Sequence, residues 1–185
     1  VHSAIIYDKS PDYTGSPILI ENYLNELSDT LPQWFADRFS FESDTIVSGF
    51  DLFGNNYSTN LMGYDVLIRI WADLNNEPVS LLYSEYSTIS ILDSDGTSSR
   101  ENLSRRYADM NLSFFAEGST QYWISMTGVS GNVSLASYVS DDDNYMWLGR
   151  WGANPRSECD FCGDMAFRLH GFSAQEVPEP GLAFV

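Results

Sequence analysis

Apolar and polar residues alternate with a period of two along much of this chain. In the segment 64–71, Tyr, Val, Ile and Ile share one face, and the intervening Asp, Leu and Arg share the other. This pattern predicts a half-buried β-strand. Similar patterns predict strands over 45–53, 81–91, 108–116, 121–126, 133–139 and 164–172.

Turn-forming residues separate these segments, at 54–56, 75–78, 93–96, 117–119 and 130–132. Short strands joined by such turns favour an antiparallel arrangement, and the 11 Tyr, 11 Phe and 5 Trp pack well on pleated sheets. We therefore expect an all-β fold, an antiparallel β-sandwich of the jelly-roll-like kind. One sandwich domain over 1–174 accounts for the length, and 175–185 is expected to be an extended tail.

One segment departs from the period of two. Six apolar residues recur there at helical spacing, namely Leu19, Ile20, Tyr23, Leu24, Leu27 and Leu31, and Pro17 suits a first helical turn. We expect one short helix, or an irregular lid, over residues 17–31.

The chain is strongly acidic. It has 9 Lys and Arg against 26 Asp and Glu, a net charge of −17, and Lys9 is its one lysine. Such a surface repels nucleic acid and anionic membranes, so no nucleic-acid partner is expected. It attracts divalent cations and cationic polymers, although acidity serves solubility equally well.

The sequence ends with Val177-Pro178-Glu179-Pro180-Gly181, followed by Leu182-Ala183-Phe184-Val185. The two prolines favour an extended conformation that suits recognition in an enzyme cleft. The segment resembles the PEP-CTERM motif of exosortase-sorted bacterial proteins. Upstream stretches are similar in their order to those of secreted β-sandwich proteins with this signal, namely 4–8, 34–41, 45–54, 65–71, 121–126 and 164–171.

The resemblance implies export, contact with an exosortase during export, and a role at the cell surface or in the extracellular matrix. It implies no catalytic residues. In that family a transmembrane helix follows the motif, whereas the four residues after Gly181 are far short of the ~20 that a span needs. Natural processing after Val185 and a shortened chain both account for the difference, and the first would make this a released matrix or fibre protein.

The two cysteines form a Cys159-Asp160-Phe161-Cys162 motif. Neither His2 nor His170 completes an obvious zinc site with them. In an exported chain we expect a local Cys159–Cys162 disulfide, with free thiols or redox chemistry as the alternatives. It would stiffen residues 151–163 rather than the whole fold.

Two acidic segments are candidates for calcium. Asp93 and Asp95 open a loop-like Asp-Ser-Asp-Gly sequence, although a plain hairpin turn explains it better, since Thr97 is a poor third ligand. Asp141, Asp142 and Asp143 could converge on a cation only from a loop, and a solvated acidic loop is the alternative. Calcium is therefore the one cofactor considered.

A dense aromatic stretch covers 145–151. Trp147 and Trp151 could stack on sugar rings while Asp143 and Asn144 bind hydroxyl groups, which would make an exopolysaccharide-binding platform. Packing of these tryptophans in the core is the alternative interpretation.

Enzymatic hypotheses find little support. No Gly-x-Ser-x-Gly motif occurs, the histidines lie at opposite ends of the chain, and no carboxylate pair stands out. We expect a non-enzymatic exported structural protein, a homo-oligomer or filament in which a strand such as 4–7 is donated to a neighbour. A calcium-assisted carbohydrate-binding module is the alternative, and a glycan-active enzyme the third candidate.

Overall fold

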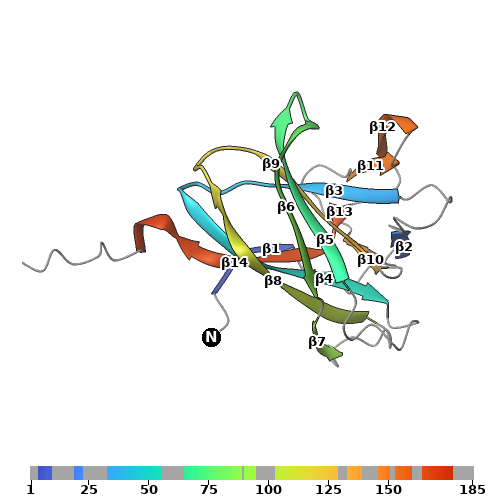
Figure 1. The fold of residues 1–185 in the computed structure, drawn as a ribbon, viewed down its shortest axis with the longest axis horizontal. Helices are drawn as coiled ribbons and strands as arrows, with labels where there is room; N and C mark the ends of the chain where they lie inside the picture. Colours follow the sequence, from blue (N-terminus) through green and yellow to red (C-terminus); the bar gives the residue numbers. More distant parts are fainter. Residues whose placement is uncertain are drawn as a thin grey trace, which may run out of the picture.

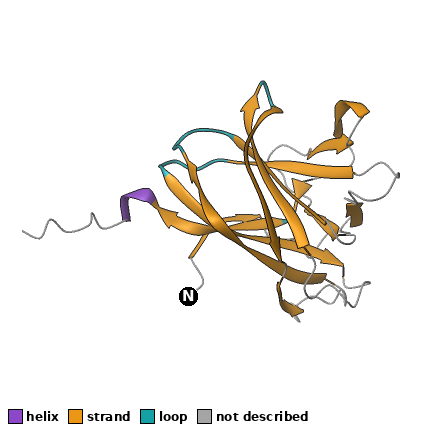
Figure 2. Cartoon of the chain, in the orientation of Figure 1, coloured by secondary structure: helices purple, strands orange, loops and turns teal. Residues whose placement is uncertain are grey.

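The computed structural model describes residues 4–9, 19–22, 33–55, 65–88, 90–94, 103–128, 133–138, 146–150, 153–159 and 164–176. Nearly all of these residues lie in strands, as Figure 2 shows. Within the described ranges the one helical segment is a 3₁₀ turn, η1 (Ala174–Glu176), where the backbone N–H of Ala174 donates to the carbonyl oxygen of Asp44. The all-β prediction is confirmed.

Eight strands form two antiparallel sheets, which we call sheet I and sheet II (Figure 1). Sheet I has the order β1 (Ala4–Lys9), β14 (Phe167–Ser173), β4 (Thr45–Asn55), β8 (Leu103–Ala116). Sheet II has the order β3 (Gln33–Phe39), β9 (Tyr122–Gly128), β5 (Asp65–Leu74), β6 (Glu77–Thr88). Counted along the chain, the strands are first, eighth, third and sixth in one sheet and second, seventh, fourth and fifth in the other. This is the order of a jelly roll, in which two Greek keys interlock.

Six further strands extend this sandwich. β7 (Ser90–Ser94) continues sheet I beyond β8, while β11 (Met146–Arg150) and β12 (Ala153–Cys159) continue sheet II beyond β3. β2 (Leu19–Asn22), β10 (Val133–Tyr138) and β13 (Asp164–Met165) form a small separate sheet. In that sheet β10 contacts β4 of sheet I, while β2 and β13 contact β3 of sheet II, so the small sheet lies against both main sheets.

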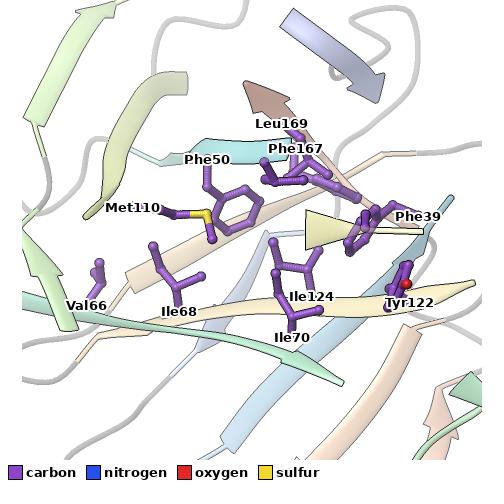
Figure 3. Close-up of a cluster of buried hydrophobic side chains, with 12 residues drawn as sticks. Phe39, Phe50, Val66, Ile68, Ile70, Met110, Tyr122, Ile124, Phe167 and Leu169 are labelled. Atoms are coloured by element: carbon purple, nitrogen blue, oxygen red, sulfur yellow. The ribbon is translucent and has the colours of Figure 1, made fainter. Parts of the chain in front are cut away.

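The main core lies between sheets I and II. Figure 3 shows Phe50, Met110, Phe167 and Leu169 of sheet I pointing toward side chains of sheet II. All of the core side chains are at most 5% exposed; those from sheet II are Phe39, Val66, Ile68, Ile70, Tyr122 and Ile124. Burial of this apolar area is the main favourable term for the fold.

The prediction that the 64–71 strand is half-buried is wrong. Val66, Ile68 and Ile70 face the core as expected, but Leu67 and Arg69 on the other face are also buried. That outer face carries a second apolar cluster of Ala36, Trp71 and Trp123, which other parts of the chain cover. Alternation of residue type identified the strand, but it did not reveal that both of its faces are covered.

The predicted helix over 17–31 is also wrong where the structure describes it. Leu19–Asn22 form β2, in which Leu19 pairs with Ala136 and Ile20 with Leu135 of β10. A short stretch of helical spacing is a weak preference, and pairing with a strand far along the chain overrides it. The remaining residues of 17–31 lie outside the described residues.

Several boundaries differ from the predicted ones. The segment 81–91 is divided between β6, which pairs with β5, and β7, which pairs with β8. The segment 164–172 is likewise divided at Ala166. The predicted turn at 75–78 is present at Asn75 and Asn76, whose positive φ angles of 56° and 64° are those of a tight type I′ hairpin turn.

Candidate functional site

The first strand, β1, closes one side of the sandwich. It pairs along sheet I with β14, where Tyr7 lies opposite Leu169 and Lys9 opposite Phe167. The register shifts between Ile5 and Tyr7, and this bulge lets the adjacent Ile6 and Tyr7 both pack against the core. β1 therefore contacts both sheets, although it pairs with only one.

Tyr7 holds β1 to a group of aromatic side chains. Its ring stacks on Phe167 with centroids 5.3 Å apart, and meets Phe39 and Phe41 edge-on at 6.4 and 6.3 Å. Its hydroxyl donates to the backbone carbonyl oxygen of Arg38 at 3.3 Å. Such aromatic pairs stabilise beyond simple burial of area.

Lys9 crosses from β1 to β3 of the opposite sheet. Its Nζ lies 3.4 Å from each carboxylate oxygen of Asp37. The Lys9 side chain is 7% exposed and that of Asp37 0%, so both charges are removed from water. The backbone N–H of Arg38 donates to Asp37 Oδ1 at 2.6 Å. We call this buried ion pair the Lys9–Asp37 clasp.

The outer side of β1 is held differently. Arg168 Nε donates to Asp8 Oδ1 at 2.9 Å in a partly exposed ion pair, and the guanidinium lies 5.1 Å from the ring centroid of Phe53. Nearby, a Cβ at Gly171 would lie 1.9 Å from the carbonyl oxygen of Ile46 and 2.7 Å from Cδ1 of Ile6. Only glycine allows this close approach between β14 and its neighbours.

The opposite side of the sandwich ends at β6, a strand of 12 residues at the edge of sheet II. We call this side the β6 edge. It exposes large apolar side chains at the end of β5 and along β6, namely Leu74, Val79, Leu81, Leu82 and Tyr86. Long apolar edges favour pairing with another chain.

Tyr83 lies on the same strand but points to the core, where it meets Phe114 edge-on. Its hydroxyl donates to the Glu85 carboxylate. Burial, together with this hydrogen bond and the negative charge of Glu85, raises the pKa of Tyr83 far above its usual value.

A second buried pair lies on the outer face of sheet I. His170 Nε2 is 3.0 Å from Asp51 Oδ2, and both side chains are almost inaccessible to solvent. The Ser48 hydroxyl donates to the His170 backbone carbonyl oxygen at 3.5 Å, not to the imidazole. The pair joins β4 to β14.

The structure describes few of the sequence-predicted site residues. Asp93 lies in β7, where it pairs with Arg105, and Trp147 lies in β11, opposite Ala36 and Glu158. Cys159 ends β12, while its predicted partner Cys162 is outside the described residues. The other predicted site residues also lie outside them: Asp95, Asp141, Asp142, Asp143, Asn144, Trp151 and the motif residues Val177, Pro178, Glu179, Pro180 and Gly181. The disulfide, calcium, carbohydrate and sorting hypotheses thus remain predictions.

Among the residues that the structure does describe, no group of three or more His, Cys, Asp or Glu side chains is arranged to hold a metal ion. In the same part of the chain, no helix has the length and apolar character needed to cross a membrane. Comparison with protein-family models, with curated proteins and with solved structures finds no match to this chain.

Proposed function

We propose that this protein is a non-catalytic structural subunit of an extracellular assembly, in which each subunit donates β1 to the sandwich of the next. The observation that carries the proposal is the position of β1. It is an edge strand, it is the first strand of the jelly roll, and it is held through Tyr7, Asp8 and Lys9. The donated segment predicted from the sequence, 4–7, lies within this strand.

The contacts of β1 are the kind that a second copy can reproduce. Phe167, Arg168 and Asp37, which receive its side chains, all belong to the body of the sandwich. A neighbour's β1 would meet the same residues in the same register, so exchange requires no new interface chemistry. Reciprocal exchange gives a closed dimer, and head-to-tail exchange gives a filament.

The charge of the chain suits a secreted material. At −17 the subunits repel one another at low ionic strength, which keeps them dispersed until salt or divalent cations screen the charge. In this proposal the subunit acts at the bacterial cell surface or in the exopolysaccharide matrix, as the resemblance to exosortase-sorted proteins implies.

Disulfide trapping tests the exchange. Asp8 and Arg168 are register partners, so the full-length chain would carry both Asp8→Cys and Arg168→Cys. The protein would be concentrated, oxidised and examined on non-reducing gels and by negative-stain electron microscopy. Exchange predicts filaments or dimers whose subunits become covalently linked on oxidation.

The unsubstituted chain, with only Cys159 and Cys162, is the matched control for unrelated cross-links. Oligomers in which the two introduced thiols form disulfides only within one subunit would show that β1 stays in its own sandwich. A monomer at every concentration and salt would refute the assembly itself.

A further inference from the structure

We propose that Lys9 and Asp37 condense into an amide bond, which covalently joins β1 to β3 across the two sheets. The reacting atoms are Lys9 Nζ and the side-chain carboxyl carbon of Asp37, and the ion pair described above is the precursor. The inference goes beyond the proposed assembly. Within one folded chain the bond fixes β1 in its own sandwich, whereas after exchange of β1 the same two residues join neighbouring subunits.

The fold brings the two groups together and fixes both backbones. Lys9 is held opposite Phe167 in sheet I, and Asp37 opposite Ile124 in sheet II. Nζ is equidistant from the two carboxylate oxygens, at 3.4 Å from each, so it faces the carboxyl group as a whole. Two reactants held in this way react as if each were at a very high concentration.

Burial favours the reactive forms of both groups. An ammonium and a carboxylate out of water are each costly, and a proton transfer between them leaves a neutral amine and a neutral carboxylic acid. The amine is the nucleophile and the acid is the electrophile that amide formation requires. Two buried core residues exclude solvent from the pair. Phe39 lies two positions after Asp37 in β3, and Phe167 lies opposite Lys9 in β14.

A hydrogen-bond donor is already in place for the charge that develops. The Arg38 backbone N–H donates to Asp37 Oδ1 at 2.6 Å. When Nζ attacks the carboxyl carbon, this oxygen becomes the oxyanion of the tetrahedral intermediate. A fixed backbone donor at that position stabilises the intermediate without reorganisation.

The reaction balances without a co-reactant. The bond between Nζ and the carboxyl carbon forms, and the bond from that carbon to Oδ2 breaks. Of the three ammonium protons, two leave with Oδ2 as water and one stays on the amide nitrogen. No oxidant, metal or nucleotide is consumed.

The sequence makes the test simple because Lys9 is the one lysine of the chain. The full-length folded protein would be denatured and reduced, its intact mass measured, and a sample digested with a lysine-specific endoprotease. We expect a mass lower than the sequence mass by one water, no cleavage after Lys9, and a branched peptide containing positions 9 and 37 in a second digest.

The Lys9→Arg variant is the matched control, since it keeps the cation but a guanidinium does not acylate under these conditions. It should show its full sequence mass. A wild-type chain of full sequence mass that the protease cuts after Lys9 would overturn the proposal and leave an ion pair only. Loss of water with normal cleavage after Lys9 would overturn it too, because it would indicate dehydration elsewhere, such as a succinimide. Failure of the bond leaves exchange of β1 possible, and failure of the assembly leaves the bond possible within one subunit, so the two failures are separate results.

Discussion

The two long sides of the sandwich are built in different ways. On the β1 side, the buried Lys9–Asp37 ion pair joins sheet I to sheet II. The stacked rings of Tyr7 and Phe167 and the partly exposed Asp8–Arg168 ion pair join β1 to β14. On the other side, the β6 edge leaves Leu81 53% and Tyr86 55% exposed. The β1 side is joined by specific ion pairs and aromatic contacts, whereas the β6 edge exposes apolar side chains to solvent.

This difference separates two routes to self-association. Exchange of β1 would use specific, directional contacts and so give one defined register. Pairing through the β6 edge would use exposed apolar side chains and a strand backbone, which is the less specific route of aggregation. Variants on each side should therefore have different effects on stability and on assembly.

The largest effect is expected at the clasp. For the ion pair, Lys9→Ala removes the cation that faces the buried Asp37 carboxylate, and should lower the free energy of unfolding by about 3–5 kcal/mol. Asp8→Ala, which breaks the partly exposed pair with Arg168, is the control and should cost at most about 1 kcal/mol. Urea unfolding followed by Trp fluorescence measures both, and equal losses would mean that burial of the clasp contributes nothing.

A smaller contrast is expected for two tyrosines. Tyr7→Ala removes the ring that contacts Phe39, Phe41 and Phe167, and should cost about 2–3 kcal/mol, toward the low end for aromatic truncations because Tyr7 is only partly buried. Tyr86→Ala on the β6 edge should change stability by no more than about 0.5 kcal/mol. A Tyr86 variant as unstable as the Tyr7 variant would contradict the asymmetry.

Alkaline pH should lower the stability of the fold through Tyr83, which lies on the β6 side. The pKa of Tyr83 is raised in the folded state, so the folded protein holds this proton more tightly than the unfolded chain does. The stabilisation is complete below the unfolded pKa of about 10 and is lost as pH rises above it. Thermal unfolding between about pH 8 and 11 should show a decline above pH 10 that is shallower in Tyr83→Phe. An identical pH profile for the two proteins would refute this assignment.

The smallest effect on stability is expected for Leu81→Lys. The side chain is exposed, so the free energy of unfolding should change by less than about 0.5 kcal/mol, while the added charge should suppress edge-to-edge association. Ser84→Lys adds the same charge to the same strand without removing apolar surface. Sedimentation of both variants at high salt separates the two effects. If Leu81→Lys abolishes ordered filaments, the β6 edge rather than β1 is the assembly interface.

Sequence reasoning was most successful with strands that show regular alternation. It identified β4, β5, β9 and β10 within a few residues, and it predicted the jelly-roll-like sandwich to which β4, β5 and β9 belong. It was wrong about how far β5 is buried, because the covering of an outer face depends on distant parts of the chain. It was wrong at 19–22 because the partner strand, β10, is more than one hundred positions away.

The clasp was missed for a similar reason. Lys9 is the one lysine, and Asp37 lies in the segment 34–41 that resembles secreted β-sandwich proteins, but nothing in the local pattern pairs them. A lysine that continues the apolar face of a strand, in a chain otherwise free of lysine, was the available signal. Asp51 and His170 likewise meet only because β14 returns to lie beside β4.

The pairing of β1 with β14 has a consequence for the order in which the chain is made. Asp8 and Arg168, which face each other in this ladder, are 160 positions apart. The chain is made from its amino end, so β1 waits without its partner strand until β14, about 160 positions later, has been made. During that interval the edge of a finished neighbouring molecule competes for it. The rate of chain delivery, relative to the concentration of finished neighbours, would then set how many molecules close on themselves.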